Sequence, residues 1–158
     1  MTKISKIISG GETGADRGAL DAAMDSGVEH GGWCPKGRLA EDEQIPEKYK
    51  LEEMDSEAFI LRSEKNVKES DATIVFSFGA LGAASLTTKI LAKNEKKPYL
   101  VVDLNKDDKK NLEELTEFCE SIGKDSIVLH ISGTRAGNAK HIHEHVQKIV
   151  SELIKTVN

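Results

Sequence analysis

The stretch IISGGETGADRGALD, residues 7–21, decides the fold: a short apolar run leads into a glycine-rich turn, and a helical pattern of small residues follows. Glycine adopts the positive φ angles at which backbone N–H groups converge, and a helix just after the turn adds the positive end of its dipole. This pattern is typical of a phosphate cradle. Its spacing, GGxTG, matches neither GxGxxG nor GxxxxGKS/T, so neither NAD nor ATP is the expected ligand. For this turn alone, a connection without any ligand is an equal alternative.

The order of strand, turn and helix recurs along the chain. Short β-branched runs indicate buried strands, and a glycine-rich extended piece indicates one more. The expected strands are residues 4–9, 28–34, 72–77, 99–104 and 126–132. Because strands alternate with amphipathic helices, we expect an α/β fold with a mainly parallel five-stranded sheet and helices on both faces.

Helices are expected where apolar residues recur every three or four positions. Residues 56–69 are interpreted as one such helix, with Ser56 as its N-cap, with Phe59 and Ile60 turned inward and with Val67 as a third candidate for the inward face. Another helix is expected from Ala15 to a C-cap at Gly27, and one more through Leu86 and Ile90. The last two are expected where apolar stripes run from Leu112 to Ile122, ending near Gly123, and from Ile142 to Val157.

Three glycine turns follow strands and precede helices, at residues 10–14, 79–82 and 133–137. The carboxyl ends of parallel strands meet at one edge of a sheet, so these turns should be neighbours in space. One pocket could then use all three turns. Their convergence favours a ligand site over simple connections.

Composition limits the function. With 158 residues, the chain is expected to form one domain over residues 1–158. Aromatic residues make up only 4% and the net charge is -5, so we expect no nucleic-acid partner. There is no apolar run approaching ~20 residues and no signal-like start, so we expect no membrane partner and a cytoplasmic location. Cys34 and Cys119 lack metal-ligand spacing and are interpreted as reduced thiols.

Several motifs resemble a known family. They are GGETGADR at residues 10–17, GGWCPKGR at 31–38, AED at 40–42, Arg62 with Asn66, and SDA at 70–72. Over nearly its whole length the chain resembles the molybdenum cofactor carrier proteins, a circularly permuted YpsA-like group. That group belongs to a Rossmann-like superfamily that includes the "Lonely guy" nucleotide phosphoribohydrolases. The resemblance implies a Rossmann-like domain in which the strands, numbered along the chain, have the permuted order 2-1-5-3-4.

The resemblance also implies a function. It points to a carrier or binding protein for the molybdenum cofactor (molybdopterin), with a phosphorylated pterin or a nucleotide held at the glycine turns. A nucleoside 5'-monophosphate phosphoribohydrolase is the alternative. In those enzymes the corresponding turn reads PGGxGTxxE, whereas residues 77–89 read SFGALGAASLTTK and lack the glutamate. The hydroxyls of Thr87 and Thr88 are neither acids nor bases near pH 7, so no catalytic residue is assigned.

The expected nucleotide-binding and phosphate-binding residues come from the three turns and from the motifs that carry the resemblance. Asp16 is given two equal roles, accepting a hydrogen bond from a ribose or pterin, or stabilising the dipole of its helix. Residues 33–46 are interpreted as a lid that carries two cations. The full set is Gly10, Gly11, Thr13, Gly14, Asp16, Arg17, Lys36, Arg38, Arg62, Asn66, Gly79, Gly82, Gly133, Thr134 and Arg135.

Other conspicuous residues are given structural roles. Cys34 could be a thiolate ligand for molybdenum, but a structural thiol is favoured. Positions 141 and 145 share a helix face while His143 points away, so His141, His143 and His145 are not expected to form a metal site. A homo-oligomer, dimer or tetramer, is expected, although the apolar stripe of the last helix serves equally as core or as a subunit interface.

Overall fold

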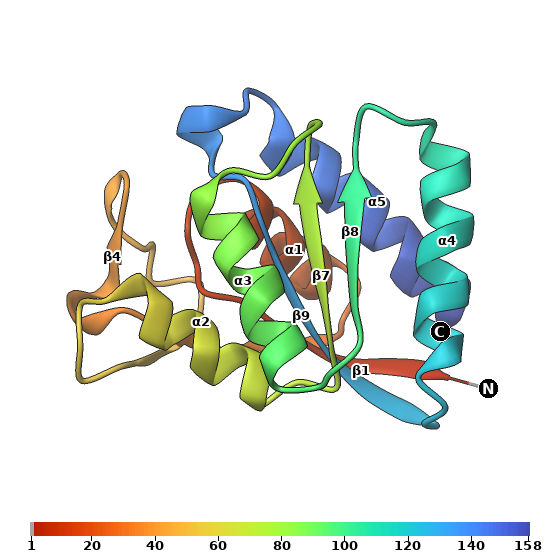
Figure 1. The fold of residues 1–158 in the computed structure, drawn as a ribbon, viewed down its shortest axis with the longest axis horizontal. Helices are drawn as coiled ribbons and strands as arrows, with labels where there is room; N and C mark the ends of the chain where they lie inside the picture. Colours follow the sequence, from red (N-terminus) through yellow and green to blue (C-terminus); the bar gives the residue numbers. More distant parts are fainter. Residues whose placement is uncertain (1) are drawn as a thin grey trace.

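The computed structural model describes residues 2–158, which contain a sheet of five strands with every neighbouring pair parallel (Figure 1). Their spatial order is β2 (Glu29–Gly31), β1 (Lys3–Ile8), β9 (Ser126–Gly133), β7 (Ala72–Ser77) and β8 (Tyr99–Asp103). Counted along the chain, these strands stand in the order 2-1-5-3-4. The predicted Rossmann-like α/β fold and its permuted strand order are therefore confirmed.

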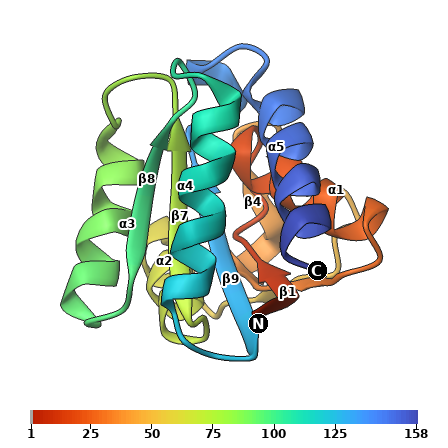
Figure 2. The same ribbon diagram turned by 90° about the vertical axis from the view of Figure 1, so that its right-hand side faces the viewer.

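Helices cover both faces of the sheet (Figure 2). One face carries α1 (Ala15–Asp25), α4 (Asp108–Ser121) and α5 (Ile142–Val157), and α5 packs against both of the others. The opposite face carries α2 (Phe59–Lys68) and α3 (Ala83–Asn94), which pack against each other. Because both faces are covered, the strands at the centre of the sheet are rich in buried apolar residues. All six residues of β7 are buried.

The main core lies between the sheet and these helices. Its fully buried side chains include Ile4, Ile7, Ile74, Leu129 and Ile131 from β1, β7 and β9. Burying one such side chain contributes roughly 1.5–3 kcal/mol. The strands and helices that position the site are therefore stabilised by the main hydrophobic core.

The segment predicted as one extended piece, residues 28–34, is divided in the structure. β2 ends at Gly31, and β3 (Trp33–Cys34) pairs with β6 (Glu52–Glu53) in a separate two-stranded sheet. The prediction of one strand was wrong because Gly32, with φ of 118°, turns the chain between them. A side chain there would collide with the backbone of Ser9, so only glycine fits.

The region predicted as a lid, residues 33–46, is folded. A short 3₁₀ turn, η1 (Lys36–Arg38), leads into a hairpin of β4 (Leu39–Ala40) and β5 (Glu43–Gln44). The region shares a small second core with α1, formed by the buried residues Leu20, Cys34, Ile45 and Tyr49. In Figure 1 its hairpin, labelled β4, stands to the left of the main sheet.

Helix α2 begins later than predicted. Ala58 is its N-cap, while the Ser56 hydroxyl accepts a hydrogen bond from the Ala58 N–H at 3.1 Å. Phe59 and Ile60 were predicted to face inward, but they are 46% and 52% exposed. The buried residues of α2, Asn66 and Val67, lie in its later turns, so the inward position predicted for Val67 is confirmed and those of Phe59 and Ile60, at the start of the helix, are wrong. No helix within residues 2–158 has the length and apolar character needed to cross a membrane.

Candidate functional site

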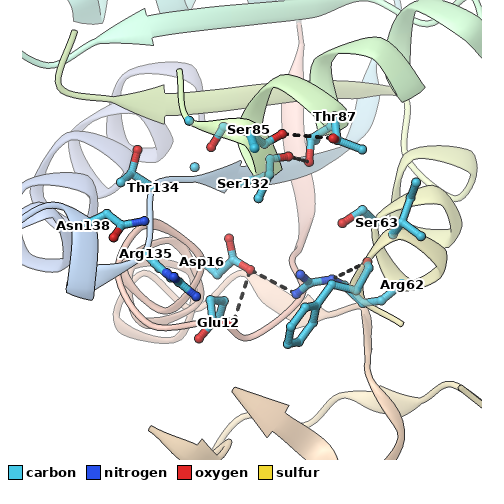
Figure 3. A pocket seen from close by; sticks show the side chains of 17 residues that line it. Glu12, Asp16, Arg62, Ser63, Ser85, Thr87, Ser132, Thr134, Arg135 and Asn138 are labelled. Atoms are coloured by element: carbon cyan, nitrogen blue, oxygen red, sulfur yellow. Dashed lines mark hydrogen bonds and ion pairs between the residues drawn. The ribbon is translucent and has the colours of Figure 1, made fainter. Parts of the chain in front are cut away.

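A pocket lies at the place where the direction of the sheet connections reverses. β9 and β7 are neighbours, but the helices that follow them, α5 and α3, lie on opposite faces of the sheet. Such a switch point leaves a crevice at the carboxyl ends of the strands. A cavity of about 510 Å³ occupies it (Figure 3). It is lined by Glu12, Asp16, Phe59, Ile60, Arg62, Ser63, Gly82, Ala83, Ala84, Ser85, Thr87, Thr88, Ser132, Gly133, Thr134, Arg135 and Asn138.

The first turn of α3 forms one wall of this pocket. Gly82 is its N-cap, and no side chain within residues 2–158 caps the helix. The bond from the Leu86 N–H to the Gly82 carbonyl, at 2.9 Å, is the first helical bond, which leaves the preceding N–H groups without helical partners. The Thr87 hydroxyl donates to the Ala83 carbonyl of its own helix at 2.9 Å. This wall therefore offers backbone donors and the positive end of a helix dipole.

Opposite this wall, Figure 3 shows Arg62, Asp16 and Arg135. Arg62 Nη1 lies 3.6 Å from Asp16 Oδ2, and the two side chains are only 12% and 6% exposed. The same carboxylate oxygen accepts the Glu12 N–H at 3.2 Å. Burial raises the pKa of Asp16 from its ordinary value of 3.8 to about 6, although the Arg62 guanidinium opposes that rise. The pocket thus holds a buried ion pair whose carboxylate is costly to ionise.

The opening glycine turn lies behind this pair. Arg62 extends over Gly10, where an added Cβ would overlap the guanidinium. Gly14, with φ of 84°, lies against the backbone of residues 134–136. Two donors of the turn are already occupied: the Glu12 N–H bonds to Asp16 Oδ2 at 3.2 Å, and the Thr13 N–H to Glu12 Oε1 at 2.9 Å. Just after the turn, the Ala15 N–H bonds to the Thr134 carbonyl at 3.1 Å. These close approaches explain the glycines without a ligand.

The tip of the β4–β5 hairpin rests on the same turns. Glu41 Oε2 accepts hydrogen bonds from the Thr13 hydroxyl and, at 2.9 Å, from the Gly137 N–H. Arg17 donates to both carboxylate oxygens of Asp42, at 2.6 and 2.8 Å. The Arg17 fork holds the pKa of Asp42 below its ordinary value. Two carboxylates of this chain therefore occupy donors that the sequence suggested for an external anion.

The structure brings some of the expected site residues together and leaves others apart. Those that line the pocket are Asp16, Arg62, Gly82, Gly133, Thr134 and Arg135. Those outside its lining are Gly10, Gly11, Thr13, Gly14, Arg17, Lys36, Arg38, Asn66 and Gly79.

Several of the residues outside the pocket stabilise loops. Arg38 donates to the carbonyls of Pro46 and Tyr49 at 2.9 and 2.8 Å, so it holds the region around the hairpin. Asn66 is fully buried and brackets Trp33, accepting its N–H at 2.8 Å and donating to its carbonyl at 3.0 Å. Lys36 lies exposed in η1. The Gly79 N–H donates to Asp103 at 2.8 Å.

Sequence analysis missed several lining residues. Glu12 lies inside the GGETG motif, and Ser132 precedes the third glycine turn, so position beside a turn was an available signal for both. Phe59 and Ser85 belong to helix ends that face the pocket, and no local pattern distinguishes them.

Residues 7–154 of the chain match the circularly permutated YpsA SLOG family. The chain belongs to this family. The search of curated proteins finds no match. Among solved structures, the chain is similar to a crystal structure named "Putative molybdenum carrier protein" from Syntrophus aciditrophicus SB, with 40% identity and a TM-score of 0.91 over 97% of this chain and 96% of that one. The predicted family resemblance is confirmed.

In this YpsA-family chain, the histidines and cysteines lie outside the pocket lining. His143 pairs with Asp21 and His145 with Asp108, each at 2.7 Å, which joins α5 to α1 and α4. Burial raises the pKa of the Cys34 thiol, so it is held protonated in the small core. Within residues 2–158 no group of three His, Cys, Asp or Glu side chains is arranged to hold a metal ion.

Proposed function

We propose that this protein binds a small phosphorylated ligand in the pocket at the switch point, with the phosphate at the start of α3. The observation that carries the proposal is the uncapped first turn of α3, which forms the pocket wall opposite Arg62 and Arg135. Backbone N–H groups and the helix dipole attract an anion there, and the positive charges of the two arginines attract it from the other side of the pocket.

The name of the similar crystal structure supports the molybdenum cofactor, a phosphorylated pterin, as the cargo. The pocket lining fits the phosphate and the ring of such a ligand. The α3 wall suits its phosphate, and the exposed Phe59 ring suits a flat heterocycle. Neither cysteine lines the pocket, so the protein would hold the ligand by phosphate and heterocycle. A nucleotide shares both parts and is a second candidate of the same class.

The proposal is for binding and carriage, without turnover. The glutamate of the phosphoribohydrolase turn is missing from residues 77–89. The Thr88 hydroxyl, like that of Thr87, donates to a carbonyl of its own helix, at 3.3 Å. We expect no release of free base when the protein is incubated with nucleoside monophosphates, as measured by chromatography. Clear release that is lost in Arg62→Ala would favour the hydrolase instead.

A pair of substitutions at Ala84 tests the phosphate position. Ala84 is exposed in the first turn of α3 and lines the pocket. Ala84→Glu places a negative charge where the phosphate would lie, while the helix dipole keeps the variant folded. Ala84→Gln is nearly the same size and carries no charge.

Calorimetry with GMP, AMP, a pterin phosphate and inorganic phosphate gives the readout. We expect the wild type and Ala84→Gln to bind at least one organic phosphate, and Ala84→Glu to bind it about ten- to a hundred-fold more weakly, the effect of one charge-assisted hydrogen bond. The melting temperature of Ala84→Glu should be unchanged or higher. Equal affinity in the two Ala84 variants, or no binding by the wild type, would refute the proposal.

A further inference from the structure

The geometry points to Asp16 as the group that selects the heterocycle. Its carboxylate accepts hydrogen bonds from a ring N–H and the adjacent 2-amino group, a donor edge that guanine and pterins share. This inference rests on the proposed function because it concerns the same pocket. It adds what the phosphate wall cannot supply, a means of distinguishing one phosphorylated heterocycle from another.

Asp16 has one engaged oxygen and one that faces the pocket. Oδ2 accepts the Glu12 N–H and lies beside Arg62. The Ser9 hydroxyl lies close enough to this carboxylate to lower the pKa of Asp16, but its single proton is donated to the Ile131 carbonyl at 2.6 Å. Within residues 2–158, every side-chain nitrogen or oxygen that is closed off from solvent has a hydrogen-bond partner. The hydrogen bond that Asp16 accepts goes to Oδ2, so Oδ1 is the oxygen that stays open to solvent. The small accessible part of Asp16, 4% exposed, is therefore this oxygen in the pocket wall (Figure 3).

An ionised carboxylate accepts hydrogen bonds and donates none, so the ligand group that meets Asp16 must be a donor. The guanine or pterin edge presents two neighbouring N–H donors. The adenine edge presents a donor beside a ring nitrogen lone pair, and that lone pair would face a negative oxygen. Hydrogen bonds to a buried charge are strong, and leaving the charge unpaired is costly. Asp16 should thus favour guanine-like rings over adenine.

A ribose diol also has two donors, but the surroundings of Asp16 suit a ring better. Arg62 contacts Asp16 with its guanidinium, and its Cζ also lies 5.4 Å from the centre of the Phe59 ring. Phe59 lines the pocket and is 46% exposed. An acceptor at one end and an aromatic face at the other form a slot for a flat ring with a donor edge.

Calorimetry with GMP, IMP, AMP and 2',3'-dideoxy-GMP, on the wild type and on Asp16→Asn, tests the inference. IMP keeps the ring N–H and lacks the amino group. We expect the wild type to bind GMP more tightly than IMP and at least about tenfold more tightly than AMP, with dideoxy-GMP close to GMP. Asp16→Asn should lose this preference and keep its affinity for AMP. Asp55→Asn, an exposed carboxylate elsewhere, should behave as the wild type.

The outcomes separate this inference from the proposed function. If GMP and AMP bind equally to the wild type while Ala84→Glu abolishes both, the pocket is right and the role of Asp16 is wrong. A loss of affinity confined to dideoxy-GMP would show that Asp16 reads the sugar, which also overturns the inference. If the wild type binds none of the four nucleotides, the inference fails. Should Asp16→Asn fold poorly, the order of GMP, IMP and AMP on the wild type still decides.

Discussion

Replacing Asp16 by asparagine should stabilise the protein near neutral pH. Asp16 is only 4% exposed, and burial raises its pKa from 3.8 to about 6, so the folded state resists its ionisation. Two charged groups face this carboxylate: Arg62, which favours the ionised form, and Glu12, which opposes it. Asparagine keeps an oxygen for the Glu12 N–H and carries no charge.

The magnitude follows from the two pKa values. A difference from 3.8 to about 6, at ~1.4 kcal/mol for each pKa unit, corresponds to about 3 kcal/mol. Between these values the folded protein binds more protons than the unfolded chain, so the Asp16 contribution to the free energy of unfolding falls as pH rises. The cost is almost absent at pH below about 4 and complete above about 7. This figure of about 3 kcal/mol already includes the attraction between Arg62 and the Asp16 carboxylate, because that attraction contributes to the Asp16 pKa.

Urea unfolding, followed by far-UV circular dichroism and by fluorescence of the single tryptophan, Trp33, measures this effect. The free energies of unfolding of the wild type and Asp16→Asn should nearly coincide at pH 4, and the variant should gain up to about 3 kcal/mol by pH 7.5. The exposed Asp55→Asn serves as the control and should show no such trend. A difference between Asp16→Asn and wild type that is constant from pH 4 to 7.5 would refute the reasoning.

Three further outcomes are expected. Burial lowers the pKa of His130 to about 3, so its contribution to the free energy of unfolding is fully present above pH 6.5 and falls as the pH drops. Between pH 6.5 and 4, the free energy of unfolding of His130→Gln, measured in urea, should therefore fall by about 3 kcal/mol less than that of the wild type. Parallel pH dependences would contradict this. Asn66→Ala removes both hydrogen bonds to Trp33 and should cost about 2 kcal/mol in urea unfolding; a loss under about 0.5 kcal/mol would show that the bracket is dispensable. Sedimentation checks the expected homo-oligomer. Ile90, 49% exposed on α3, is a candidate contact, so Ile90→Glu should shift the protein toward the monomer. An unchanged oligomer would show that the exposed face of α3 is not the subunit interface.

Local sequence determined most of the fold. The strand at residues 72–77 was predicted with the bounds that the structure has, and the last helix was predicted from its apolar stripe between Ile142 and Val157. In both cases the signal, a run of apolar residues or a helical stripe, is visible within one segment. The permuted strand order followed from the family resemblance. The meeting of three glycine turns at one edge followed from parallel topology.

Tertiary packing decided which of the expected residues line the pocket. The opening GGETG turn has the composition of a phosphate cradle, yet the N–H groups of Glu12 and Thr13 bond within the chain, whereas the start of α3 keeps its N–H groups without helical partners. From the sequence, Arg17 was one of several candidate cations for the ligand. In the structure its guanidinium is paired with Asp42, from a hairpin 25 residues away in sequence. Whether a donor is available depends on what the rest of the chain places against it, and residues 7–21 hold no information about that.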